Sequence, residues 1–311
     1  MPDRFASTPL SINRELERAI AEAPYDEDRW IVLEDWLLEC DDPRSVIVRL
    51  EKVNRMRGAR RLLRHLHPQL LGEDHATLAP ALFIADWRAG YLRECHFAAN
   101  EVDALGSLCR APAATLLRGL TVSIPKPRVA TAMEQIAGGV FADTLHDLTV
   151  SNVHVEAPIL SASMLARLPR LRRLALRGAY VEGPAEIERI ATLLVAPTRY
   201  DLANLTPFLR DVRFTAVTDL LLDLTNLAEP ALEPSTLEPV LTDHFTPRLQ
   251  RIEIRMATPQ IARDAIRILA TSALLPQLRA VNLGGIDASA RMRRDHGDVF
   301  DHLNVMLPDG Y

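Results

Sequence analysis

The chain has 311 residues, of which 48% are hydrophobic, so it is long and apolar enough for about two domains with a continuous core. No apolar run reaches the roughly 18 residues that a membrane span needs, and no signal-type apolar block follows the start, so we expect a cytoplasmic protein with no membrane partner. The net charge of −5 argues against a general attraction to nucleic acid.

Three helices are expected first along the chain, because apolar residues recur there at helical spacing. Their inward positions are Leu16, Ala19, Ile20 and Ala23, then Trp30, Leu33, Leu37 and Cys40, then Val46, Ile47, Leu50 and Val53. Pro24 and the acidic stretch 26–28 separate the first two helices, and Asp42 is a suitable N-cap for the third. We expect residues 1–57 to form a helical module with Trp36 in its core.

Two motifs in this module carry a resemblance to a known family. Asp35-Trp36-Leu37 lies in the second expected helix, and Asp42-Pro43-Arg44 opens the third. In type and spacing they resemble the bacterial repeat-companion domain, a short segment found beside repeat arrays, often leucine-rich ones. Asp41 and Ser45 stand where that pattern has glycines, and Val46 where it has glutamate. The family has no assigned catalysis, so the resemblance implies a companion of a scaffold, without an active site.

A basic run interleaved with leucines follows the module. Its members are Arg57, Arg60, Arg61, Arg64, His65 and His67. The run is either the solvated face of a helix or a patch that binds RNA or an acidic partner. We expect residues 58–90 to be a helical junction, in which Trp87 packs between the module and the segment that follows.

From residue 91 a short phrase recurs, with apolar residues at relative positions 1, 4 and 6. The copies are Leu92/Cys95/Phe97, Leu117/Leu120/Val122, Leu145/Leu148/Val150, Leu171/Leu174/Leu176, Val217/Leu220/Leu222, Leu249/Ile252/Ile254 and Leu278/Val281/Leu283. The last two apolar residues of each copy alternate with polar ones, which predicts a short, half-buried strand. A strand that recurs every two to three dozen residues or so predicts a solenoid.

Helices are expected between these strands. Their ranges are 102–109, 129–141, 159–168, 186–194, 237–245 and 261–275. A repeat of one strand and one helix resembles the longer, ribonuclease-inhibitor-like leucine-rich repeats, which curve with a parallel sheet inside and helices outside. We therefore predict an α/β fold, with a leucine-rich-repeat-like solenoid over residues 91–285 and a C-terminal helical cap over residues 286–311.

The interval between Leu174 and Leu220 is the irregular part, because it spans 46 residues (220 − 174 = 46). It holds either a hidden strand at Tyr200/Leu202, or Leu209/Val212/Phe214 as a strand in place of Leu220, or a loop insertion. We favour an insertion over residues 197–212, since long loops on solenoids often carry binding.

The sequence lacks the common catalytic and metal-binding motifs. The sequence has no GxSxG, HExxH, P-loop or GxGxxG motif, and three cysteines without CxxC spacing predict buried free thiols (Cys40, Cys95 and Cys109). Asp298 and His302 have helical ligand spacing, with Asp295 and His296 nearby, but no third shielded ligand. His96, Asp147 and Thr149 are the remaining catalytic candidates. We expect no enzyme, no cofactor and no metal.

Charged residues flank the central apolar positions of the middle repeats and should lie on the inner face of the solenoid. They are Arg173, Arg177, Asp219, Asp223, Arg251, Glu253 and Arg255. Their signs alternate along the repeats, so neighbouring strands would set opposite charges side by side. They form either a solvated ladder or the centre of a protein-binding site.

From this face we predict a protein-protein interaction scaffold, an adaptor or regulator. A nucleic-acid-binding module that uses the run 57–67, and an enzyme with an unrecognised site, are the alternatives. The identity of the partner, the process and the oligomeric state stay open.

Overall fold

The structure is a computed structural model. It describes residues 10–82, 84–98, 103–152, 156–198, 202–227, 234–255, 265, 267–269 and 271–284. The chain divides into a first unit, Met1–Ser123 with Ala130–Leu148 and Arg167–Arg170, and a second unit, Ile124–Val129 with Thr149–Ala166 and Leu171–Tyr311. The fold is α/β, with a nine-stranded, mostly parallel sheet.

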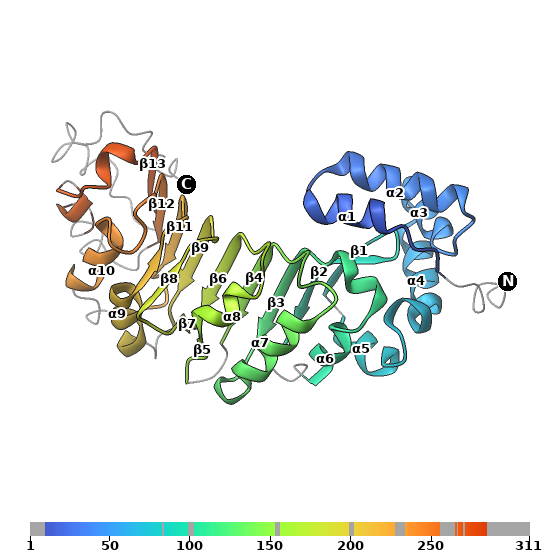
Figure 1. The fold of residues 1–311 in the computed structure, drawn as a ribbon, viewed down its shortest axis with the longest axis horizontal. Helices are drawn as coiled ribbons and strands as arrows, with labels where there is room; N and C mark the ends of the chain where they lie inside the picture. The colour runs from blue at the N-terminus through green and yellow to red at the C-terminus, as the bar shows by residue number, and fades with distance from the viewer. Residues whose placement is uncertain are drawn as a thin grey trace. The chain divides into compact units, whose positions relative to one another are not determined.

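The elements follow in chain order (Figure 1). The helices are α1 (Arg14–Glu22), α2 (Glu27–Glu39), α3 (Ser45–Lys52), α4 (Met56–Leu71), α5 (His75–Ala81), α6 (Leu105–Leu108), α7 (Val129–Gly138), α8 (Ala162–Ala166), α9 (Leu202–Asp211) and α10 (Pro234–Leu241). The strands of the large sheet, in spatial order, are β1 (Ala85–Arg88), β2 (Tyr91–Phe97), β3 (Gly119–Ser123), β4 (Asp147–Ser151), β6 (Arg173–Arg177), β9 (Thr192–Ala196), β11 (Asp219–Asp223), β12 (Arg251–Arg255) and β13 (Ala280–Gly284). Two small sheets pair β5 (Ile159–Leu160) with β7 (Tyr180–Val181), and β8 (Ala185–Ile187) with β10 (Val212–Phe214).

The three helices expected first along the chain are present as α1, α2 and α3. The Asn13 side chain accepts a hydrogen bond from the Leu16 amide (3.2 Å) and caps α1, and Asp26 accepts one from the Asp28 amide (3.1 Å) and caps α2. Between these helices lies a core of fully buried side chains, with Ile20, Trp30, Leu33 and Leu37 among them.

The prediction that Trp36 occupies this core is wrong, because Trp30 does. Trp30 is 0% exposed, whereas Trp36 is only partly buried at the edge of the cluster. With 3.6 residues per turn, Trp36 lies about 120° around α2 from Trp30, away from the buried face. Cys40, which follows α2, is exposed, against expectation. Cys95 and Cys109 are buried as free thiols, and burial raises the pKa of both.

Residues 58–90 form α4, α5 and β1, so the expected helical junction ends in a strand. β1 pairs with β2 in an antiparallel hairpin whose turn holds Ala89 and Gly90 at positive φ (50° and 79°). Trp87 stacks on His67 of α4, with ring centroids 6.1 Å apart and an interplanar angle of 19°. The hairpin is thereby attached to the helices that precede it.

Parallel strands with alternating burial make up the sheet of the second unit, where β6, β9, β11, β12 and β13 lie side by side (Figure 1). One face is apolar and buried, as the repeat phrase predicted. Its side chains include Leu174, Leu176, Leu193, Val195, Leu220, Leu222, Ile252 and Ile254. An aromatic cluster of Tyr180, Phe208, Phe214 and Phe245 fills another part of this unit's core, with centroids 5.4 to 6.2 Å apart.

The long interval between Leu174 and Leu220 contains an additional strand, so the favoured loop insertion is wrong. Ile190, Leu193 and Val195 repeat the spacing of positions 1, 4 and 6, all three are buried, and β9 carries the last two between β6 and β11. Residues 202–211 then form α9, and β10 pairs with β8. Neither strand alternative holds: Leu202 begins a helix, Leu220 stays in β11, and Tyr200 lies outside the described residues.

Two of the expected helices begin as strands. No helix forms over residues 186–194, where β8 ends at Ile187 and β9 begins at Thr192, and residues 159–160 form β5 before α8 begins. Most of the helix expected at 261–275, and the whole cap at 286–311, lie outside the described residues. None of the helices in the described ranges has the length and apolar character needed to cross a membrane.

Candidate functional site

The second unit exposes the other face of its parallel strands. Three rows of side chains run across it, and we call them together the open face. The first row is Arg173, Thr192, Asp219 and Arg251, the middle row is Ala175, Leu194, Leu221 and Glu253, and the last row is Arg177, Ala196, Asp223 and Arg255. The rows alternate with the buried positions along each strand, as the period of 2 requires, and only Ala196 among their members is buried. All seven residues predicted for the site lie on this face.

Ion pairs link β11 to β12 on the open face. Arg251 donates to Asp219, and the Arg255 guanidinium lies 2.8 Å from Glu253 and 4.0 Å from Asp223. Burial would raise the pKa of Asp219, but hydrogen bonds from Arg251 and Thr218, together with the charge of Arg251, outweigh it and lower that pKa. Asp219 is therefore ionised, and both acidic side chains of β11 are already paired with arginines of β12.

The predicted alternation of Arg173, Asp219 and Arg251 on adjacent strands is only half right. Asp219 and Arg251 are register neighbours, but Thr192 of β9 stands between Arg173 and Asp219. The basic residues of β6 are thus one strand removed from the acidic residues of β11. The missed strand β9 is the physical reason, since it widens the sheet at this point.

The middle row has an apolar centre that was not predicted from the sequence. Leu194 and Leu221 are register neighbours on β9 and β11, with Ala175 next to Leu194 and Glu253 next to Leu221. Both leucines are only partly buried. The spacing of Ile190, Leu193 and Val195 was the signal that could have revealed β9, and with it this centre.

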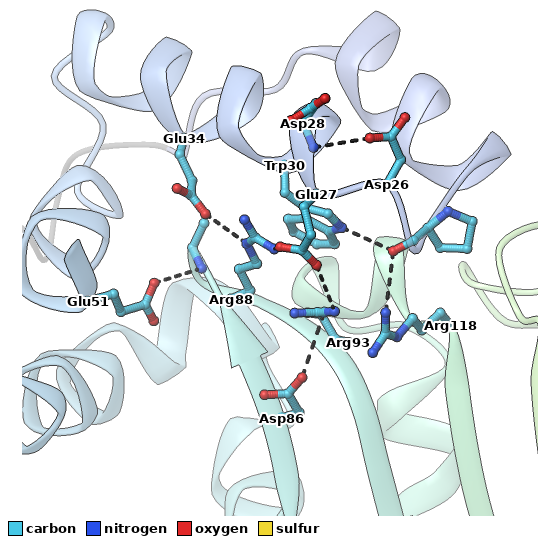
Figure 2. A network of polar contacts seen from close by, with 12 residues as sticks. Asp26, Glu27, Asp28, Trp30, Glu34, Glu51, Asp86, Arg88, Arg93 and Arg118 are labelled. Atoms are coloured by element: carbon cyan, nitrogen blue, oxygen red, sulfur yellow. Dashed lines mark hydrogen bonds and ion pairs between the residues drawn. The ribbon is translucent and has the colours of Figure 1, made fainter. Parts of the chain in front are cut away.

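A second polar cluster lies in the first unit, where α2 meets the β1–β2 hairpin (Figure 2). Arg88 donates to Glu34 (2.7 Å) and to Glu27, and its guanidinium lies 5.2 Å from the centre of the Trp30 ring. Arg93 lies over the same ring at 5.5 Å, with its nitrogens 3.7 Å from Glu27 and from Asp86.

Further contacts extend this cluster to β3. Arg118, which precedes β3, pairs with Glu94 at 2.6 Å and donates to the Pro24 carbonyl at 3.4 Å. Five carboxylates surround three guanidinium groups; the carboxylates are Glu27, Glu34, Glu51, Asp86 and Glu94, and the cations are Arg88, Arg93 and Arg118. The excess of negative charge does not favour an anionic ligand, so the cluster is an attachment of α2 to the hairpin.

Glu51 is the member of this cluster whose charged form is disfavoured by burial. Its carboxylate accepts only a long hydrogen bond from the Ala89 amide (3.5 Å), and burial raises its pKa above the ordinary value of 4.5. The folded state therefore binds this proton more tightly than the unfolded chain does. This tighter proton binding stabilises the folded state below pH 4.5. The contribution to stability is lost as the pH rises through the folded-state pKa of Glu51.

Glu51→Gln is expected to raise the melting temperature at pH 7 by about 1–3 °C, because glutamine keeps the acceptor without burying a charge. The gain should shrink as the pH falls towards 4, where the wild-type side chain is itself neutral. Thermal unfolding followed by circular dichroism between pH 4 and pH 8 measures it, with exposed Glu15→Gln as the control. A gain that is equal at all pH values would contradict this account.

The catalytic candidates are not assembled into a site within the first unit. His96 lies on β2, Asp147 lies on β4 and accepts a hydrogen bond from the Tyr25 hydroxyl, and β3 stands between the two strands at a spacing of ~4.8 Å per strand. Thr149 belongs to the second unit. Among the described residues, no three His, Cys, Asp or Glu side chains gather as metal ligands, and residues 295–302 lie outside this range.

Comparisons of the chain with protein-family models, with curated proteins and with solved structures found no match. Function is therefore inferred from the two faces of the sheet, their charges and their register. Of the two polar clusters, the one in the first unit links elements of the chain to each other. The open face of the second unit is the candidate site.

Proposed function

We propose that the chain is a non-enzymatic protein-protein interaction scaffold, an adaptor or regulator, which binds a protein partner on the open face. One observation carries this proposal. Parallel sheets are ordinarily covered on both faces, yet β6, β11 and β12 bury one face and leave the alternate, mostly charged side chains of the other accessible. A face of this kind, which stays accessible among the described residues, is suited to a partner.

The proposed architecture is a leucine-rich-repeat-like solenoid over residues 91–285. The repeated spacing of apolar residues supports it, and so do the parallel strands with their regular register. The motifs Asp35-Trp36-Leu37 and Asp42-Pro43-Arg44 support a repeat-companion-like module at residues 1–57. A module without catalysis beside a repeat array agrees with a scaffold.

The chemistry of the open face agrees with a protein ligand. Protein interfaces combine an apolar centre with a polar rim, and here Leu194 and Leu221 lie between two charged rows. The arginines of these rows present planar donors that match carboxylates. Strands hold the donors at fixed spacing, which lowers the entropy lost on binding.

Reversing Arg173, Arg177, Arg251 and Arg255 to Glu is expected to weaken partner binding by on the order of 100-fold or more, since each lost charged hydrogen bond removes ~1.5–3 kcal/mol. A partner is first identified by capture on the immobilised wild-type chain and mass spectrometry. The purified partner is then titrated against wild type and variant by calorimetry.

A matched variant separates this surface from the basic run. Arg57, Arg60, Arg61 and Arg64 are all exposed on α4, and their reversal to Glu changes the net charge by the same amount. The α4 variant should bind the partner as wild type does. Retained binding by a folded open-face variant would refute the proposal, and loss only in the α4 variant, with a steep dependence on salt, would favour the nucleic-acid alternative.

A further inference from the structure

Helix α2 has an inner face and an outer face that differ in their contacts. Its inner face carries Glu27, Trp30 and Glu34 towards the β1–β2 hairpin, as Figure 2 shows. Its outer face has the spacing of a single helical stripe and is exposed at every position. This acidic stripe consists of Asp28, Ile31, Val32, Asp35 and Glu39. It combines three carboxylates with two large apolar side chains.

A surface of opposite charge adjoins the acidic stripe. Residues at the end of α3 and the start of α4 form it, and all of them are exposed; this basic corner consists of Arg49, Lys52, Val53, Arg55, Met56 and Arg57. Lys52 donates to Asp35 at 2.9 Å, so the two surfaces meet at this ion pair. Glu51, the one carboxylate between residues 49 and 57, is instead directed to the Ala89 amide.

Most charges of the basic corner have no acidic partner among the residues that the structure describes. In the described part of the chain, Arg49, Arg55 and Arg57 form no ion pair, although the protein has 41 acidic residues against 36 Lys and Arg. A shortage of carboxylates is therefore not the reason. Four cations face outward here beside a stripe of three carboxylates.

Exposed apolar side chains concentrate on the same surface. Ile31, Val32, Val53 and Met56 are 44%, 52%, 63% and 43% exposed, and six of the nine large apolar side chains exposed in the described ranges lie in residues 10–56. Isolated exposed apolar residues need no explanation. Four of them between opposite charges have the composition of an association surface.

We propose that two copies of the chain associate through this surface, with the acidic stripe of each copy on the basic corner of the other. A two-fold axis beside the Asp35–Lys52 pair generates both contacts at once, because a two-fold interface uses the same patch on each copy. A polyanion would be repelled by the stripe. An unrelated protein would need a basic surface for the acidic stripe and an acidic surface for the basic corner. A second copy of the chain already carries both.

Wild-type chain is expected to form a dimer whose dissociation constant rises about tenfold or more between 50 mM and 500 mM salt, since exposed charges are screened. Sedimentation velocity over a range of protein concentrations measures this. Val32→Ser, which removes an exposed apolar group without changing the charge, should weaken the dimer, and circular dichroism checks that it folds.

Two charge reversals test the trans arrangement. Asp28→Arg with Glu39→Arg makes both surfaces basic, and Arg55→Glu with Arg57→Glu makes both acidic, so each variant alone should be monomeric. An equimolar mixture of the two should regain a 1:1 dimer, because both contacts are then complementary. Arg213→Glu with Arg248→Glu, at exposed positions of the second unit, is the matched control and should leave the dimer intact.

Three results would overturn the proposal. They are a wild-type chain that stays monomeric at every concentration, a dimer that both reversals leave unchanged, and a mixture of the two folded variants that fails to associate. Because the test uses the purified chain alone, its failure leaves the scaffold proposal for the open face untouched.

Discussion

Arg44→Ala is expected to lower the free energy of unfolding of the first unit by about 3–5 kcal/mol, as the removal of one member of a buried ion pair does. The Arg44 and Asp42 side chains are 4% and 0% exposed. Asp42 accepts from Arg44 through the backbone amide (2.8 Å), Nε (2.9 Å) and the guanidinium (3.0 Å). Arg44→Ala would remove both guanidinium donors of this buried carboxylate, together with its counter-charge, and leave it only backbone amide donors.

The same pair ties three distant segments together. Asp42 accepts from the Ser11 amide at 2.6 Å, and the Arg44 guanidinium donates to the Ser11 carbonyl and lies 4.8 Å from the centre of the Tyr91 ring. Gly90 is required beside it, since a Cβ there would come within 2.7 Å of the Arg44 side chain. The Asp-Pro-Arg motif is thus a structural joint between the helices and β2.

Denaturant unfolding monitored by tryptophan fluorescence measures the effect. Arg18→Ala, at an exposed position of α1, is the control and should change stability by less than about 0.5 kcal/mol. Burial would raise the pKa of Asp42, but its bonds to Arg44 lower it, so the stabilisation holds above the ordinary pKa of 3.8 and is lost as the pH falls further. A variant within about 1 kcal/mol of wild type would refute this role.

Trp30→Ala is expected to lower the same free energy by about 3–5 kcal/mol, as large aromatic deletions from cores do. Trp30 is fully buried, donates to the Pro24 carbonyl at 3.3 Å and meets Tyr91 edge to face at 6.5 Å. Its removal would leave a cavity and take the ring away from beneath Arg88 and Arg93.

Trp36→Ala is the matched control, because it makes the same substitution in the same helix. Trp36 is only partly buried at the edge of the core, so Trp36→Ala should lower the free energy of unfolding by about 1 kcal/mol. Denaturation curves of the two variants, recorded by circular dichroism because each loses a tryptophan, give the comparison. Equal losses, or the larger loss in Trp36→Ala, would contradict the burial described for α2.

Local periodicity was enough to predict most of the elements. The spacing of apolar residues at positions 1, 4 and 6 marks strands whose inward side chains are buried, such as Leu174 in β6 and Ile252 in β12. Helical spacing likewise predicted α1, α2 and α3. These signals are readable because burial on one side of a strand or helix imposes its period on neighbouring residues.

The spacing of apolar residues alone could not decide between a strand and a helix for the segment that forms β9. Ile190, Leu193 and Val195 match the repeat phrase, yet a helix was expected over residues 186–194. Pairing with β6 on one side and β11 on the other decides for a strand, because the hydrogen bonds of β9 come from those neighbours. The open face and its apolar centre depend on that decision.

What the sequence determined by itself is therefore the kind and order of most of the elements, through patterns that extend over a few residues. Tertiary structure decided which residues meet: Arg88 with Glu34 across 54 positions, Arg44 with Tyr91, and Thr192 between Arg173 and Asp219. The choice of Trp30 over Trp36 for the core was made in the same way. Such contacts depend on how elements pack against one another. The local spacing of apolar residues does not show which distant segment will pack against an element, or on which side.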